Sequence, residues 1–286
     1  SERTAADELR EHLRAITGEV LTIVAEADFD AARQTPLLVG RCAATAKLAP
    51  DIDFASLGKE GLHVRSVDGA LVFAGNQRGV LYAVYEFLER ELGVRWLTPD
   101  CRVLPTAGPI DVAALDHHYQ PPLEFRDTNY PFNPTPAFYT RARFNGGNCT
   151  VGEAFGGSEV YGGFVHTFHW FISPDEFFDK HPEYFSLIDG QRTRHAQLCL
   201  THPEVATVMT EQVRAMGRGN AMITIVSISQ NDTGGACECE ACSALAAAEG
   251  SQAGPLLHFV NTVADNLREE FPDLLIDTLA YQYTRK

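Results

Sequence analysis

One stretch of the chain decides its expected fold: Ser227-Ile-Ser-Gln-Asn-Asp-Thr-Gly-Gly-Ala-Cys-Glu-Cys-Glu-Ala-Cys242. It continues a largely apolar run, residues 221–226, whose composition favours a buried strand. Asn231 and Asp232 stand where that strand would end. Because a (β/α)8 barrel presents its catalytic groups at the C-terminal ends of its strands, the stretch predicts a polar site on such a strand.

The residues around this stretch predict a unit of strand, helix and strand. After a long loop, apolar residues recur at helical spacing over residues 255–267, and Leu274–Ala280 is a near-continuous apolar run. This order is typical of a βαβ unit with a parallel sheet. Thr201 and Glu204 fit a capping box at the start of an earlier helix.

The N-terminal part of the chain mixes short strands with helices. Residues 61–74 predict a hairpin whose turn is Asp68-Gly69. Apolar residues at steps of three and four predict a helix that begins near Gly79 and ends at Gly93. Two shorter strands are expected at 21–25 and 36–40.

The length of the chain, 286 residues, is enough for about two domains. A Pro-rich segment at 120–122 indicates the boundary between them. We therefore expect a small α/β domain over residues 1–118 and a second domain over residues 119–286.

Composition narrows the class of partner. The hydrophobic fraction is 45% and the charged fraction 21%, as in ordinary globular proteins. A net charge of −15 makes nucleic acid or an anionic membrane surface an unfavourable partner, because phosphate binding needs clustered Lys and Arg. No run approaches the about 18 apolar residues of a membrane span. A neutral ligand fits this charge balance better.

The cysteines do not settle the compartment. There are seven, and four stand singly along the chain: Cys42, Cys101, Cys149 and Cys199. This is not the dense pattern of a disulfide framework. The chain does not begin with Met, and a secreted or periplasmic location is favoured if the full-length protein carries a signal peptide.

Several motifs together resemble a known family, the domain-of-unknown-function 4838 family. They are Gln230-Asn-Asp232, the Cys-x-Cys-x2-Cys cluster that follows it, Glu249-Gly-Ser251, Phe259-Val-Asn261, Ala280-Tyr-Gln-Tyr-Thr284, His181-Pro-Glu-Tyr-Phe185 and Gln197-Leu-Cys-Leu-Thr201. That family overlaps glycoside hydrolase family 163, whose described activity is endo-β-N-acetylglucosaminidase action on N-glycans. Residues 75–99 resemble the small α/β domain that precedes the barrel in β-hexosaminidases and α-glucuronidases.

The resemblance implies an α/β fold in which the small N-terminal α/β domain is followed by a (β/α)8 TIM-type barrel. Five barrel strands are expected, near 123–128, 142–147, 163–169, 221–228 and 274–280. The residues after 120 are fewer than the about 250 of a typical barrel. We therefore expect an incomplete barrel, from a longer protein whose second catalytic carboxylate lies beyond residue 286.

The implied function is that of a glycoside hydrolase acting on β-linked N-acetylhexosamine glycans. Some such enzymes use the acetamide of the substrate as the nucleophile, assisted by a carboxylate, and retain the anomeric configuration. Asp232 is our candidate to polarise that acetamide, with Asn231 bonded to the 2-substituent of the sugar and Glu249 as the alternative acid. Asp232 and Asn231 also suit a turn, and Glu249 a solvated helix end. No cofactor is required for this chemistry.

A glycan substrate needs polar side chains and flat aromatic faces beside the catalytic carboxylate. The candidates lie at or just beyond the expected strand ends: Arg126, Asp127, His166, Trp170, Gln230, Tyr281, Gln282 and Tyr283. Buried aromatic residues are more often simply part of a core, and Arg126 and Asp127 could pair with each other.

Cys237, Cys239 and Cys242 are candidate ligands of a structural zinc ion. Such a site normally has four ligands, and Cys199 or His202 could complete the set. A disulfide among these cysteines, or plain buried thiols, would fit the same spacing.

Three other functions remain open at this level. The N-terminal resemblance also fits an α-glucuronidase-like hydrolase, whose site should gather arginines, and Arg126, Arg141 and Arg143 lie near expected strand ends. The chain could also be a non-catalytic glycan-binding fragment, or an interaction domain held together by zinc.

Overall fold

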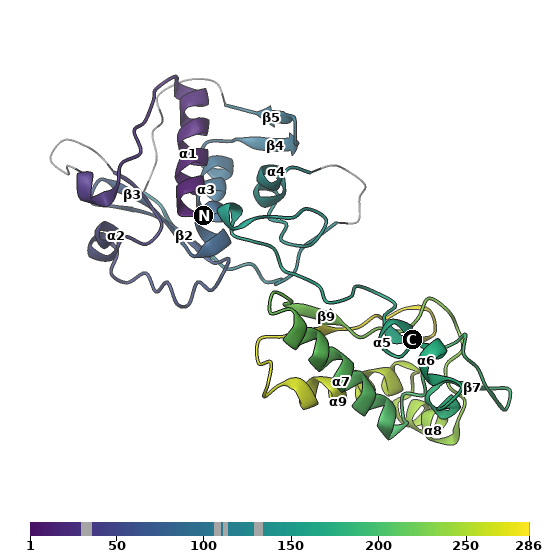
Figure 1. The fold of residues 1–286 in the computed structure, drawn as a ribbon. Coiled ribbons are helices and arrows are strands. Elements are labelled where there is room, and N and C mark those ends of the chain that lie inside the picture. The colour runs from purple at the N-terminus through teal and green to yellow at the C-terminus, as the bar shows by residue number, and fades with distance from the viewer. Residues whose placement is uncertain (30–35, 106–109, 111–113, 129–133, 286) are drawn as a thin grey trace. The chain divides into compact units, whose positions relative to one another are not determined.

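The computed structural model describes residues 1–29, 36–105, 110, 114–128 and 134–285. They form two compact units, Ser1–Ser158 and Glu159–Lys286 (Figure 1). The first unit extends past residue 118, where the Pro-rich segment led us to expect a boundary. Each unit is described by itself.

The first unit is built on a four-stranded mixed sheet. Its strand order is β1 (Leu37–Val39), β3 (Ala70–Gly75), β2 (Leu62–Val67) and β6 (Asp116–Tyr119). β1 runs parallel to β3, whereas β2 is antiparallel to both of its neighbours. Asp68 and Gly69 both have positive φ, 46° and 78°, as the two-residue turn of a tight hairpin requires. The predicted hairpin is therefore confirmed.

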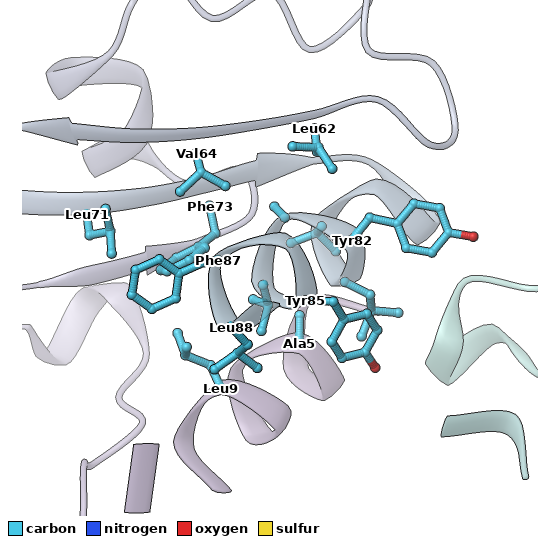
Figure 2. Close-up of a cluster of buried hydrophobic side chains, with 14 of the residues drawn as sticks. Ala5, Leu9, Leu62, Val64, Leu71, Phe73, Tyr82, Tyr85, Phe87 and Leu88 are labelled. Carbon is cyan, nitrogen blue, oxygen red and sulfur yellow. The ribbon is translucent and has the colours of Figure 1, made fainter. Parts of the chain in front are cut away.

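Alternating side chains of β3 divide the core of this unit into two layers. Leu71 and Phe73 face the helices α1 (Glu2–Thr17) and α3 (Gln77–Arg90), where Phe73 meets Phe87 edge to face at 5.3 Å between ring centroids (Figure 2). Val72 faces the opposite side, which α2 (Ala43–Leu48) covers. This alternation is the period of two that a strand buried on both faces imposes.

Three expected strands of the first unit are wrong. Residues 21–25 are irregular and are followed by a short 3-10 turn, η1 (Glu26–Asp28), and residues 123–128 and 142–147 also form no strand. Arg126 and Asn145 exchange two hydrogen bonds, Asn145 N–H to the Arg126 carbonyl and Arg126 N–H to Asn145 Oδ1. In a β-ladder both bonds would join backbone groups, whereas here the second bond is made by the Asn145 side chain. The remaining elements are the hairpin β4 (Arg95–Thr98) and β5 (Cys101–Val103), α4 (Pro136–Arg141) and η2 (Glu153–Phe155).

The second unit contains the predicted βαβ unit. β9 (Ile225–Ser227) and β10 (Leu275–Asp277) are parallel, and α8 (Glu240–Glu249) and α9 (Ala253–Leu267) lie between them in the chain. Val226 and Ile228 pack with α9 and α7 (Pro203–Gly219) in one apolar cluster. The predicted long loop after β9 is thus shorter than expected, because the Ala-rich segment after Cys239 is helical.

The other elements of the second unit are short. They are α5 (Phe168–Phe171), α6 (Pro174–Phe177), η3 (Pro182–Tyr184), the hairpin β7 (Leu187–Ile188) and β8 (Gln191–Arg192), and η4 (Gln282–Thr284). The strand expected at 163–169 is wrong, because only Tyr161 bridges to β9 and the chain then turns into α5.

The fold is mixed α/β, as expected. Among the described residues, two of the five expected barrel strands are present, β9 and β10, and the sheets do not close into a barrel. Within the same residues, no helix has the length and apolar character to cross a membrane.

Candidate functional site

The segment after β9 continues in extended form because its two faces have different partners. Val226 and Ile228 lie in the apolar cluster, while Ser227 and Ser229 are buried on the other face. There the Thr167 hydroxyl donates to the Ser227 carbonyl at 2.6 Å and accepts from Ser229 N–H at 3.0 Å. The polar face of β9 is thereby bonded to the start of α5.

Asn231 is a buried amide with all of its polar groups engaged. Its backbone N–H donates to Gln197 Oε1 at 2.9 Å, and its carbonyl accepts from Gln197 Nε2 at 3.0 Å. Its side chain donates to the Ala196 carbonyl at 2.8 Å and accepts from His169 N–H at 3.1 Å. This side chain positions the chain after β9, and a role toward a sugar stays a prediction.

Gln230 links the end of β9 to the segment after β10. It is fully buried, donates to the Tyr281 carbonyl at 2.9 Å and accepts from the Thr284 hydroxyl at 2.6 Å. Its own carbonyl lies 2.8 Å from His166 Nδ1, so Nδ1 carries the proton that makes this bond. Nε2 is then the ring nitrogen on the side of Asp232.

Asp232 is exposed at the centre of these contacts. Its side chain is 62% exposed, and Oδ1 lies 3.9 Å from His166 Nε2 and accepts from Gln282 Nε2 at 3.3 Å. The ring of His166 lies 5.3 Å from that of Tyr281. The structure thus brings together four residues that the sequence had singled out: Asp232, His166, Gln282 and Tyr281.

The backbone beside Asp232 is held in an unusual conformation. Val165, His166 and Gln282 have φ of 52°, 57° and 48°, in the left-handed region that non-glycine residues rarely adopt. Such residues persist only where surrounding contacts fix them, and they gather at binding sites.

Exposed aromatic side chains occur in the same segments. Trp170 is 60% exposed, Phe164 54% and Tyr281 36%. Gly163 lies against Trp170, since a Cβ there would come within 2.6 Å of the indole ring. Tyr283 is half-buried instead, and burial raises the pKa of its hydroxyl. Phe164 had been missed, although its place between Gly163 and His166 was a usable signal.

Glu249 lies at the C-terminal end of α8, apart from these contacts. Its carboxylate is 3.0 Å from His258 Nε2, and both side chains are largely exposed. The backbone then ends the helix at Gly250 with φ 67°. This is the environment of a solvated helix end.

Arg126 and Asp127 belong to the first unit and have separate partners there. Arg126 Nη2 is 2.8 Å from Glu60 Oε2, and its Nε donates to the Arg143 carbonyl at 2.8 Å. Asp127 Oδ2 accepts from the backbone N–H groups of Gly147 and Asn148, at 2.8 and 3.2 Å. These bonds join both side chains to neighbouring segments of the first unit.

Asp277 is a second carboxylate at the C-terminal end of a parallel strand, and the sequence reasoning missed it. It lies opposite Ser227 in the register of β9 and β10. Its Oδ2 accepts from the Tyr161 hydroxyl at 2.5 Å, and burial raises the pKa of that hydroxyl. Among the described residues, its buried Oδ1 has no hydrogen-bond partner. An acid within an apolar strand was the available signal.

Four cysteines form a compact group beside this network: Cys199, Cys237, Cys239 and Cys242. Their sulfur atoms all lie within 4.8 Å of one another. Hydrogen bonds from the Cys237 and Cys242 thiols hold the pKa of the Cys199 thiol well below its ordinary value. All four thiols are free of disulfides. Cys199 therefore joins the three predicted cysteines, and the four together form a possible metal site.

The other candidate for a fourth ligand, His202, lies outside this group. Its ring is 5.3 Å from that of Tyr184, and it is the N-cap residue of α7. The predicted capping box is wrong, because the hydroxyl of Thr201 lies 3.1 Å from Cys242 Sγ and Glu204 accepts from the Tyr184 hydroxyl. Glu204 also forms a second possible metal group with His181 and Glu183, which is partly exposed.

One comparison with known proteins identifies the family. A family model described as a domain of unknown function (DUF4838) matches residues 96–286. The chain belongs to this family. No curated protein matches it. The matched residues include both the network around Asp232 and the four-cysteine group.

Proposed function

We propose that this protein is a glycoside hydrolase that acts on β-linked N-acetylhexosamine glycans, in the endo-β-N-acetylglucosaminidase manner described for glycoside hydrolase family 163. One observation carries the proposal. An exposed carboxylate, Asp232, lies with His166 and Gln282 at the C-terminal ends of two parallel strands, and exposed aromatic residues occur in the same segments.

The proposal includes a fold. β9 and β10 would be neighbouring strands of a (β/α)8 barrel, and the first unit would be the accessory domain that resembles those of β-hexosaminidases. Two features support this: helices cover one face of the parallel pair, and small polar residues, Ser227 and Ser229, occupy the other. Residues at the C-terminal ends of barrel strands are where catalytic groups are usually found.

In this mechanism the acetamide oxygen of the substrate attacks the anomeric carbon while the glycosidic bond breaks and a general acid protonates the departing oxygen, and water then opens the cyclic intermediate. Asp232 accepts a hydrogen bond from the acetamide N–H. The carboxylate is suited to this role because it is exposed and bonded through Oδ1 to Gln282, which leaves Oδ2 for the substrate. His166, whose Nδ1 is bonded to the Gln230 carbonyl, offers Nε2 to a sugar hydroxyl. Trp170 and Tyr281 offer flat faces to the C–H groups of the sugar.

Glu249 is assigned no step in this mechanism. General acids in glycosidases are commonly carboxyls in apolar surroundings. Glu249 is about half exposed, at 47%, and its partner is His258. The metal group is likewise given no chemical step, and the reaction as proposed needs no cofactor.

An α-glucuronidase activity is less well supported. A uronate carboxylate calls for free arginines, since Arg binds carboxylates through two parallel hydrogen bonds. Arg126, Arg141 and Arg143 are instead paired, with Glu60, Glu8 and Glu89 in that order. These buried or half-buried pairs would have to open to bind a uronate.

The test is a comparison of substrates with the purified full-length protein. We expect release of glycan from an N-glycan with a β-linked N-acetylglucosamine core, and no release from an aryl α-glucuronide. Binding of the N-glycan without release would make the protein a glycan-binding module. Turnover of the glucuronide alone would replace the proposed substrate class.

A further inference from the structure

We propose that Cys199, Cys237, Cys239 and Cys242 bind one Zn²⁺ as a closed, four-thiolate site that fixes the loop after Asp232. The metal site stands on its own geometry. Its effect on turnover rests on the proposed function.

The positions of the sulfur atoms fit tetrahedral coordination of one ion. Cys199 Sγ lies 3.7 Å from Cys239 Sγ and 3.9 Å from Cys242 Sγ. With Zn–S bonds of about 2.3 Å, the edge of a ZnS4 tetrahedron is about 3.8 Å. The whole group stays within 4.8 Å, so one ion at its centre would reach all four sulfurs with small side-chain adjustments.

Hydrogen-bond donors lie close to two of the sulfurs and would stabilise thiolates bound to a metal. Leu187 N–H donates to Cys237 Sγ at 3.3 Å, and Arg192 Nη1 lies 3.7 Å from the same atom. The Thr201 hydroxyl is 3.1 Å from Cys242 Sγ. Four thiolates and one Zn²⁺ carry a net charge of −2, which these donors would partly offset. Donors of this kind commonly support metal ligands.

The ligand set fits zinc in a structural role. Soft thiolates suit zinc rather than the oxygen-seeking Mg²⁺ or Ca²⁺. Four protein ligands fill the tetrahedron, whereas a catalytic zinc keeps one position for water or substrate. Cys199, Cys237 and Cys242 are almost fully buried, with exposed fractions of 2%, 8% and 3%, so the centre would be shielded from solvent.

The site would hold both sides of the loop that carries Asp232. Cys199 closely follows Gln197, whose side chain bonds to the backbone of Asn231 and Thr233. Cys237 closes the same loop on its far side, and the backbone N–H of the next residue, Glu238, donates to the Leu187 carbonyl at 2.8 Å. Zinc would thus make Cys199 and Cys237 positioning residues for Asp232.

The first measurement is the zinc content of the purified full-length protein by elemental analysis. We expect one zinc per chain, and a loss of at least about tenfold in Cys199→Ser. Cys149→Ser is the matched control, because Cys149 is a buried thiol outside the group, and it should keep the zinc of the wild type. Absence of metal from the wild type, or full zinc content in Cys199→Ser, would overturn the site.

Cobalt substitution provides a second measurement that does not depend on the stability of a variant. Co²⁺ in place of Zn²⁺ should give the intense thiolate-to-metal charge-transfer band and visible bands of a tetrahedral four-sulfur site. A weak, octahedral spectrum would contradict it. A zinc-loaded protein without glycan turnover would leave the site intact and reject the proposed function. Turnover by a metal-free protein would reject the zinc site alone.

Discussion

The two units of this protein treat their buried polar groups differently. In the first unit the buried groups include ion pairs, such as Glu60 with Arg78 at 2.7 Å. In the second unit, the buried side chains that hold the loop around Asp232 are neutral amides, as with Gln197, Gln230 and Asn231, and the charged Asp232 is exposed. Neutral amides cost less to bury than charges do. The first arrangement joins elements of the fold through charges, whereas the second fixes the loop that carries an exposed carboxylate.

The largest expected loss of stability comes from breaking the buried ion pairs of the first unit. Glu60 bonds to Arg78, Arg126 and the side chain of Asn145, so Glu60→Gln removes the carboxylate that pairs with two guanidinium groups. We expect the free energy of unfolding to fall by about 3–5 kcal/mol. Urea unfolding, followed through Trp96 fluorescence with Trp170 replaced by Phe, would measure it.

The control for this change is the exposed pair of Glu11 with Arg102. Glu11 is 59% exposed, and its carboxylate is 3.0 Å from Arg102 Nη1. Glu11→Gln should change the free energy of unfolding by about 1 kcal/mol at most. Equal losses in the two variants would contradict the stabilising role assigned to the buried ion pairs of the first unit.

A smaller effect is expected from the amide network of the second unit. Gln197→Met keeps the volume of the side chain but leaves the buried N–H of Asn231 without its acceptor. The cost should be about 1–3 kcal/mol, concentrated in the loop around Asp232. Faster hydrogen exchange of residues 228–236, read by mass spectrometry, would show it. Gln212→Met, an exposed Gln on α7, should leave that exchange unchanged.

The smallest expected effect is on the pH dependence of the free energy of unfolding of the first unit. His12 is buried, with Nδ1 2.8 Å from the Glu8 carbonyl and Nε2 accepting from Trp96 Nε1 at 3.1 Å. Burial lowers the pKa of His12. Below the ordinary pKa of about 6.5, the unfolded chain therefore binds a proton that the folded chain does not. The free energy of unfolding should fall as pH decreases, by at most about 1.4 kcal/mol per pH unit.

This pH dependence has a direct control. His12→Gln cannot titrate, so its free energy of unfolding should fall less steeply between about pH 7 and pH 5. His118→Gln, at an exposed histidine, should keep the slope of the wild type. Identical slopes in all three proteins would show that His12 is not the group responsible.

Periodicity predicted those parts of the fold that depend on local pattern. The hairpin of β2 and β3, the helix α3 and the βαβ unit of β9 and β10 were all expected from alternating or helical spacing. The strands expected at 123–128 and 142–147 were not formed, because Asn145 bonds to Arg126 through its side chain. The capping box failed for a similar reason, since Thr201 and Glu204 bond to residues distant in the sequence.

The candidate site was predicted in part. Asp232, His166, Gln282 and Tyr281 lie at ends of apolar runs, which a sequence can show. Gln197 could not be assigned its role from the sequence, because its bonds to Asn231 span 34 positions. Cys199 was only one of two options for completing the cysteine group, and its selection needed the three-dimensional distances. The local sequence pattern indicates where a strand ends, but the residues that bond to that end are distant in the sequence.

The most direct test of a functional second unit is the rate of N-glycan hydrolysis by Asp232→Asn in the full-length protein. Asp265→Asn is the control, because Asp265 is another exposed carboxylate of the second unit, 70% exposed against 62% for Asp232. We predict that Asp232→Asn lowers kcat at least about 100-fold, as expected for loss of a group that stabilises the transition state, with an unchanged unfolding transition. Asp265→Asn should retain the wild-type rate. A near wild-type rate in folded Asp232→Asn would contradict the account.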